Sequence, residues 1–129
     1  ILAVTAAPKF IDLTGDAKAS TIEAVRGSLN SAADMAHAKA LIADTVDGDI
    51  SVNGSTITLV NGYPNKTSIN TLMDIDTSSS DSVFVLDTSG TSVATYSYKG
   101  STAATCQAIY TEAADTNNKP VINSVVTDC

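Results

Sequence analysis

The two cysteines of this chain, Cys106 and Cys129, are the residues whose types most directly suggest chemistry. Two cysteines near the C-terminus of an acidic chain rich in serine and threonine predict one disulfide in an exported protein. The alternative is a pair of free thiols in a cytosolic protein. On the chain-entropy model, closing the loop between them destabilises the unfolded chain by about 3.4 kcal/mol. We therefore expect a structural disulfide that fixes the final strand. A redox-active pair is disfavoured because the close C-x-x-C spacing is absent.

Catalytic and metal-binding candidates are few. The single histidine, His37, falls in a predicted helix between two alanines, where a solvated side chain is the simpler interpretation than a Ser-His-Asp role. Two cysteines and one distant histidine do not supply the four ligands of a structural zinc site. Asp74, Asp76 and Asp81 cluster near a predicted loop, but their spacing is not that of an EF-hand. We expect no enzymatic activity, no metal and no cofactor.

Composition limits the partners of the chain. Its 129 residues and 13.2 kDa suit one domain spanning 1–129. The net charge of −7 disfavours nucleic-acid binding, because an acidic surface repels a phosphate backbone. The two sequences Asn53-Gly54-Ser55 and Asn65-Lys66-Thr67 match the N-glycosylation pattern, which is short and common.

The first third of the chain predicts one long helix from Ile1 to about Asp44. At about 1.5 Å per residue such a helix spans roughly 66 Å, whereas a domain of this size has a radius of gyration of about 14 Å. One end must therefore protrude, and the apolar residues before Pro8 place the protruding end at the N-terminus. An exposed apolar helix end requires a partner. The alternative is a helix that begins near Asp12 or Asp16 after a disordered tail.

Within this helix, apolar residues recur at spacings of three and four, which defines one buried face. The opposite positions carry polar side chains, and Glu23 and Arg26 are spaced to pair at i and i+3. Alanines dominate the second half of the buried face, so a sheet can approach the helix axis closely. The predicted helix–sheet core residues are Ile22, Val25, Leu29, Ala33, Ala36 and Ala40.

After Asp44 the pattern changes to strands and turns. Asn53-Gly54 between two alternating runs is a strong hairpin signal and predicts strands at 49–52 and 55–60. Thr67 or Ser68 can cap a short helix that carries Ile69, Leu72, Met73 and Ile75. Further strands are expected at 83–86, 93–98, 106–111 and 121–126. The fold class is therefore α+β, with an antiparallel sheet packed on the long helix and a C-terminal disulfide; 1–44 form the helix and 45–129 a β-rich head.

The opening residues suggest a family. The run Ile1-Leu2-Ala3-Val4-Thr5-Ala6-Ala7-Pro8-Lys9-Phe10-Ile11-Asp12-Leu13 resembles the second part of the N-terminal helix of type IV (type IVa) pilins, and most resembles the mannose-sensitive haemagglutinin (MSHA) pilins of Gram-negative bacteria. In that family a longer apolar stretch with one glutamate precedes this point, so the resemblance implies an N-terminally truncated chain. It covers the whole chain in architecture and about the first 20 residues in recognisable motif.

The resemblance implies a pilin fold and a role as structural subunit of a type IV pilus (fimbrium), an extracellular filament for adhesion and biofilm formation. Before assembly, the missing N-terminal segment would anchor the subunit in the inner membrane. The implied partners are other pilin subunits in a homopolymeric filament, with host or environmental glycans as further partners and no nucleic acid. The Cys106–Cys129 segment resembles the disulfide-bounded surface loop of the family. The residues expected to pack in the filament are Ile1, Leu2, Val4, Pro8, Phe10, Ile11 and Leu13.

Three other functions are open at this point. A type II secretion pseudopilin or a minor pilin would form a short periplasmic assembly rather than a surface fibre. A DNA-uptake pilin would need a basic patch, which the acidic sequence does not provide. An enzyme would need a set of residues that can act together in catalysis, and the sequence suggests no such set.

Overall fold

The computed structural model describes residues 14–129, and its longest element is helix α1 (Thr14–Ile42). Helix α1 ends slightly before the expected Asp44 because the chain turns out of the helix there. Asp44 has a left-handed φ of 51°, the Thr45 N–H donates to the Ala40 carbonyl at 3.0 Å, and the Asp44 N–H donates to the Leu41 carbonyl at 3.3 Å. These two bonds form a Schellman motif, with aspartate in the position that glycine usually occupies. The expected helix over residues 1–13, including the proline bend, lies outside the described residues.

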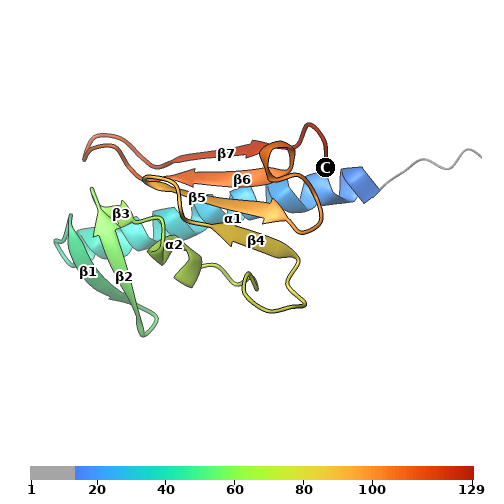
Figure 1. The fold of residues 1–129 in the computed structure, drawn as a ribbon. Helices are drawn as coiled ribbons and strands as arrows, with labels where there is room; N and C mark the ends of the chain where they lie inside the picture. Colours follow the sequence, from blue (N-terminus) through green and yellow to red (C-terminus); the bar gives the residue numbers. More distant parts are fainter. Residues whose placement is uncertain (1–13) are drawn as a thin grey trace, which may run out of the picture.

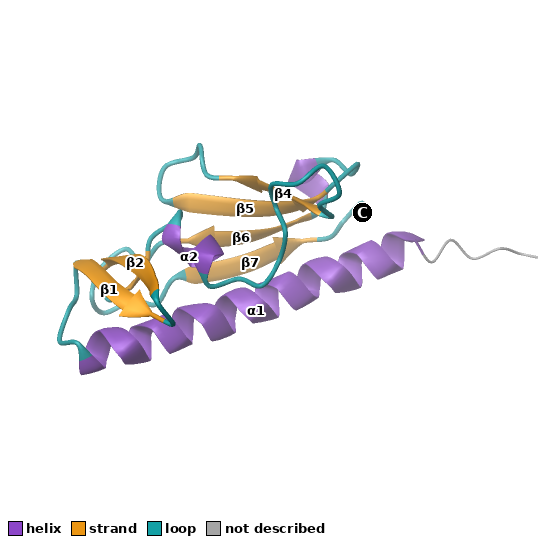
Figure 2. Ribbon diagram, turned by 90° about the horizontal axis from the view of Figure 1, so that it is seen from below, coloured by secondary structure: helices purple, strands orange, loops and turns teal. Residues whose placement is uncertain are grey.

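One stripe of α1 is buried and the remaining faces are largely exposed. The stripe packs beneath the sheets along much of the helix (Figures 1 and 2). Because most of its second half is alanine, the backbone of α1 lies close to the strands. The buried residues are Ile22, Val25, Leu29, Ala32, Ala33, Ala36 and Ala40.

The strands form two antiparallel sheets rather than the single sheet predicted from the sequence. The first contains β1 (Gly48–Val52), β2 (Ser55–Val60) and β3 (Tyr63–Pro64) in that order. The second contains β4 (Phe84–Asp87), β5 (Val93–Tyr98), β6 (Gln107–Thr111) and β7 (Val121–Val125), also in chain order. Strand β3 ends at Pro64, and the following residue still bonds to β2, because the Asn65 N–H donates to the Thr58 carbonyl at 2.9 Å.

The Asn-Gly signal placed the first hairpin correctly. Asn53-Gly54 connects β1 to β2, and Ile50 lies opposite Ile57 in the resulting register. The 88–92 segment connects β4 to β5, and a short 3₁₀ helix, η1 (Ala103–Thr105), precedes β6. Burial alternates along β5 and β6, where Ala94 and Tyr96 are buried together with Ala108 and Tyr110.

The predicted short helix is only α2 (Ser68–Thr71), so Leu72, Met73 and Ile75 lie beyond it. The expected cap at Thr67 or Ser68 is also wrong. The side-chain oxygen of Asn65 accepts hydrogen bonds from the N–H groups of Thr67 at 3.1 Å and Ser68 at 2.7 Å. Ser68 is buried instead, and its hydroxyl oxygen accepts a 2.9 Å bond from the Thr58 N–H of β2.

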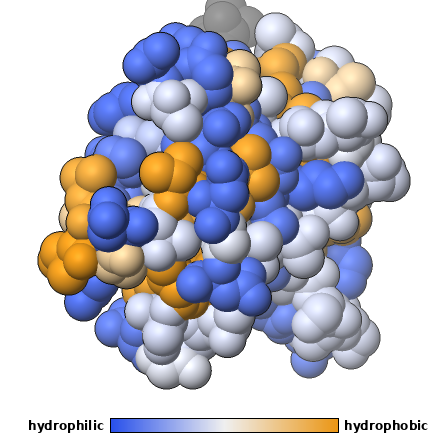
Figure 3. Space-filling view, turned by 90° about the vertical axis from the view of Figure 1, so that its left-hand side faces the viewer, coloured by the Kyte–Doolittle hydropathy of each residue, from blue (hydrophilic) through white to orange (hydrophobic). Residues whose placement is uncertain are grey.

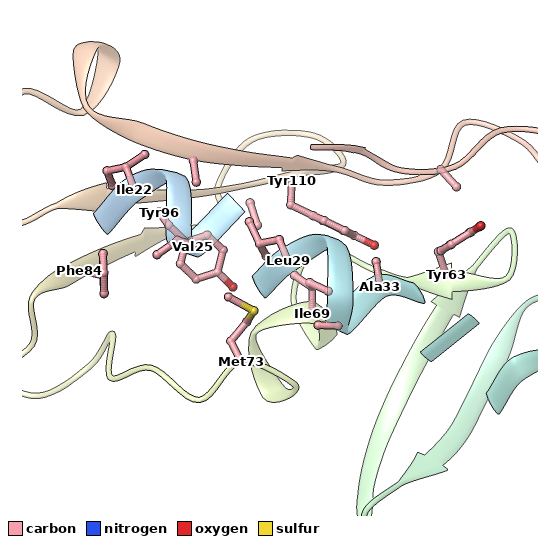
Figure 4. Close-up of a cluster of buried hydrophobic side chains, with 14 of the residues drawn as sticks. Ile22, Val25, Leu29, Ala33, Tyr63, Ile69, Met73, Phe84, Tyr96 and Tyr110 are labelled. Carbon is pink, nitrogen blue, oxygen red and sulfur yellow. The ribbon is translucent and has the colours of Figure 1, made fainter. Parts of the chain in front are cut away.

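The main hydrophobic core lies between α1, α2 and the four-stranded sheet (Figure 4). Leu29 and Ile22 of α1 are fully buried against Tyr96 of β5 and Tyr110 of β6. A second, smaller cluster joins the end of α1 to the first sheet and consists of Ala40, Ile50, Val52, Ile57 and Leu59.

Polar contacts hold the two sheets together. The Asn61 side-chain N–H donates to the Ala113 carbonyl at 2.8 Å, and the Lys66 N–H donates to the Glu112 carboxylate at 2.6 Å. The Lys66 ammonium donates to the Gly90 carbonyl at 2.7 Å. These bonds connect chain segments on either side of α2, so the two sheets form one body over the helix.

Candidate functional site: the two ends and the exposed face of α1

A disulfide joins Cys106 and Cys129, as predicted, with a Cα–Cα distance of 4.9 Å. Cys106 is fully buried between η1 and β6, and it belongs to the main core. The chain end is also held by polar contacts, because the Asp128 N–H donates to the Thr105 carbonyl at 3.2 Å and the Thr105 hydroxyl donates to the Asp128 carbonyl at 3.1 Å. The disulfide therefore fixes the segment after β7 to the connection before β6.

The start of α1 lies beside this fixed chain end. A Cβ placed on Gly15 would be 3.8 Å from the carbonyl carbon of Cys129, so helix and C-terminus are in near contact. A polar hollow of about 380 Å³ lies between them, lined by Thr14–Asp16, Lys18 and residues 126–129. The first turn of α1 extends beyond the strands at this end of the molecule (Figures 1 and 2). Any residue that precedes Thr14 is therefore joined to the body at its projecting end.

A polar seam connects one side of α1 to the edge strand β7. The Arg26 side chain donates from Nε to the Ile122 carbonyl at 3.1 Å and lies 3.7 Å from the Glu23 carboxylate, so the expected i, i+3 pair is present. Glu23 also accepts a hydrogen bond from the Ser124 hydroxyl. Lys119 lies 3.4 Å from Asp34 further along. These groups are exposed, so their ion pairs add little to the free energy of unfolding. Their role is to fix the position of β7 against α1.

The other side of α1 carries an open groove of about 620 Å³. Its floor is made by small residues of the helix, and its far wall is the segment that follows α2. The lining consists of Ala24, Gly27, Ser28, Ser31, Ala32 and Met35 of α1 with Leu72, Met73 and Asp74.

The last turn of α1 ends in a group of exposed apolar side chains that was not predicted from the sequence. Leu41 is 68% exposed, Ile42 is 83% exposed and Val46, in the following turn, is 47% exposed. Hydrophobic side chains are visible on this end of the molecule, where α1 meets the β1–β2 hairpin (Figure 3). We call these three residues the apolar end. A signal was present, since in a 3.6-residue helix Leu41 and Ile42 lie about 100° and 200° around the axis from Ala40, outside the buried stripe.

His37 is not the solvated helix residue that the sequence suggested. Its ring stacks on Tyr63 at a centroid distance of 4.1 Å with a 5° interplanar angle, and Nδ1 lies 2.8 Å from the Gly62 carbonyl. The carbonyl can only accept, so Nδ1 carries the proton. The prediction failed because position 37 borders the alanine stripe, where the 61–63 turn packs closely. A Cβ on Gly62 would lie 3.3 Å from this nitrogen, and Gly62 also has a φ of +84°.

The three aspartates considered for calcium do not form a cation site in the part of the chain that the structure describes. Asp76 accepts bonds from the N–H groups of Ser78 at 3.0 Å and Ser79 at 3.1 Å, and from the Ser79 hydroxyl. The hydroxyl bond, followed by the backbone bonds, lowers the pKa of Asp76. Over residues 14–129, no group of three or more His, Cys, Asp or Glu side chains is arranged to hold a metal ion.

The six predicted helix–sheet core residues all lie on the buried stripe of α1, where none is more than 4% exposed. Cys106 and Cys129 are bonded to each other. The residues expected to pack in a filament (Ile1, Leu2, Val4, Pro8, Phe10, Ile11 and Leu13) lie outside the described residues.

Comparisons with known proteins give no further assignment. No protein-family model matches the chain, and neither a curated protein nor a solved structure matches it. Among the helices formed by residues 14–129, none combines the length and apolar content needed to cross a membrane.

Proposed function

We propose that this chain is a structural subunit of a type IV pilus, with a pilin fold, and that the filament it forms serves adhesion and biofilm formation. The observation that carries the proposal is the placement of α1. One stripe of this helix is buried, and its first turn projects past the strands (Figure 2). The apolar residues of the opening sequence attach at that projecting end.

The energetics favour association through α1. An apolar side chain buried fully at a subunit contact contributes about 1.5–3 kcal/mol. The opening sequence offers several such side chains, and the apolar end offers more at the opposite end of the helix. The opening sequence precedes α1 in the chain and the apolar end lies at its C-terminus, so we propose a head-to-tail contact between copies. A repeated head-to-tail contact that does not close produces an open filament.

The disulfide is consistent with export. It joins a core residue to the last segment of the chain and so stabilises a body that must persist outside the reducing cytosol. In the proposed filament the sheets face outward and present the β6–β7 loop and the disulfide-bounded segment to other subunits, surfaces or glycans. The anchor in the inner membrane before assembly would be supplied by an apolar segment preceding Ile1.

Electron microscopy of cells that express the gene tests this function. We expect thin surface filaments that a gene deletion removes and the wild-type gene restores, with antibody against the chain decorating the shaft. Decoration only at filament tips would indicate a minor pilin. A requirement for protein secretion, without surface filaments, would indicate a secretion pseudopilin. Normal filaments after deletion, with secretion intact, would contradict the proposal.

A further inference from the structure

We propose that Asn53-Gly54, at the tip of the β1–β2 hairpin, is a site of spontaneous deamidation, and that the packing of the fold protects the equivalent dipeptide Asn61-Gly62. The sequence contains the tripeptide Val-Asn-Gly twice, at 52–54 and 60–62. Intrinsic reactivity at the two sites is therefore closely similar, because glycine follows each asparagine and offers no side chain to hinder attack on its nitrogen.

The two dipeptides also have nearly the same φ angles. The φ values are 51° and 82° for Asn53 and Gly54, and 54° and 84° for Asn61 and Gly62. The shared tripeptide and the similar φ angles therefore give little reason for the two sites to react differently. Any difference must come from their surroundings.

The surroundings differ strongly. The Asn61 side chain donates to the Ala113 carbonyl at 2.8 Å, and the Gly62 N–H, whose nitrogen must attack, donates to the Val46 carbonyl at 2.7 Å. Asp47 accepts a 3.0 Å bond from the Asn61 N–H, and His37 bonds the Gly62 carbonyl. The turn cannot rearrange without breaking these contacts.

The hairpin tip has no such restraint. Asn53 and Gly54 are exposed, and a Cβ on Gly54 would meet nothing within 4 Å. Across residues 14–129, no hydrogen bond engages the Asn53 side chain or the Gly54 N–H. Asn53 and Gly54 can change their backbone conformation while the last strand pair, Val52–Ser55, stays in place. Such a local rearrangement costs little free energy.

The reaction needs no reagent other than water. The Gly54 nitrogen attacks Cγ of Asn53, the new N–Cγ bond forms as the Cγ–Nδ2 bond breaks, and the side-chain nitrogen leaves as ammonia with the proton from the Gly54 amide. Water then opens the succinimide ring at either carbonyl carbon. One product has an aspartate at position 53, and the other has isoaspartate, which adds a methylene to the backbone of a two-residue turn. Both products add one negative charge to the net −7.

The experiment incubates the full disulfide-bonded chain at neutral to mildly alkaline pH and follows both peptides by mass spectrometry after digestion. Each hydrogen bond that must break typically lowers the reactive population about fivefold. The two bonds that hold the Asn61 side chain and the Gly62 N–H therefore predict deamidation about 30-fold faster at Asn53. In concentrated urea after reduction, the two rates should converge. Equal rates in the folded chain, or no reaction at Asn53, would overturn the proposal.

Two variants separate protection from reactivity. Asn53→Gln should abolish the fast reaction and leave the slow reaction at Asn61. Asp47→Ala removes one restraint on the 61–62 turn, so deamidation at Asn61 should accelerate several-fold while the Asn53 rate stays unchanged. An unchanged Asn61 rate in Asp47→Ala, with the fold intact by circular dichroism, would contradict the protection argument.

Discussion

The hydroxyl of Tyr110 donates a 2.5 Å hydrogen bond to the backbone carbonyl of Pro64. Tyr110 belongs to β6 of the four-stranded sheet and Pro64 to β3 of the three-stranded sheet. Both residues are buried, so the bond forms away from water. Like the Asn61 and Lys66 contacts, this hydrogen bond joins the two sheets, but it is buried. It therefore fixes the position of one sheet relative to the other.

Replacing Tyr110 with phenylalanine should destabilise the fold by about 1–2 kcal/mol. The substitution keeps the ring in the core but removes the donor to a buried carbonyl. Urea denaturation followed by circular dichroism measures the effect. Tyr96→Phe is the matched control, because its hydroxyl donates at 3.1 Å to Asn70, a half-buried side chain that water can reach. We expect a smaller loss there, and a larger loss in Tyr96→Phe would contradict this account of the sheet junction.

The stability of the protein should fall at alkaline pH. Burial raises the pKa of Tyr96, and burial with the nearby Glu112 carboxylate raises the pKa of Tyr110. Above the unfolded value of about 10, the unfolded chain loses these protons while the folded chain keeps them. The free energy of unfolding then decreases by about 1.4 kcal/mol per pH unit for each of the two tyrosines.

Denaturation midpoints between pH 9 and 12 test this expectation, together with tyrosinate absorbance. Ionisation of Tyr96 and Tyr110 should coincide with unfolding. Tyr96→Phe removes one of the two groups and should halve their contribution to the slope. A slope that is the same in wild type and Tyr96→Phe would show that burial of this residue does not control the alkaline transition.

Loss of the disulfide should destabilise the C-terminal part of the fold first. Cys129→Ser is expected to cost about 3 kcal/mol, to loosen the last strand and to reduce filament yield. Hydrogen exchange should show lost protection in β7 before α1, since the segment after β7 carries the bond. The double variant Cys106→Ser/Cys129→Ser controls for the free thiol that the single change leaves. Unchanged thermal stability in both variants would contradict a structural role.

The apolar end should matter for association and little for folding. Val46→Ser and Val83→Ser make the same change at side chains that are 47% and 44% exposed. Surface changes of this kind usually alter stability by less than about 0.5 kcal/mol. If the apolar end contacts another subunit, filament yield should fall in Val46→Ser and stay normal in Val83→Ser. Equal yields with equal stabilities would remove the apolar end from the proposed contact.

The sequence was sufficient for the features that depend on local pattern. Apolar spacing located the buried stripe from Ile22 to Ala40, Asn53-Gly54 located the first hairpin, and the two cysteines identified the disulfide. The first two signals act over a few neighbouring residues. The third is unambiguous because each cysteine has only one other cysteine to pair with.

The features that escaped prediction depend on contacts between distant segments. The strands divide into two sheets, and the bonds that join those sheets, such as Asn61 to Ala113, connect segments 52 residues apart, which no periodicity encodes. The stacked position of His37 depends on a turn 25 residues further along the chain. The cap of α2 was expected at Thr67 or Ser68, but the Asn65 side chain accepts the N–H bonds of both residues, and the Ser68 hydroxyl bonds to β2 instead.

The disulfide also determines what a protease can do to this molecule. Residues 114–119, between β6 and β7, are all exposed and form the natural place for a first cut. Cys106 and Cys129 lie on opposite sides of that segment, so a nick there leaves both fragments covalently joined. The cleaved protein would migrate as one species on a non-reducing gel and separate into two only after treatment with a thiol.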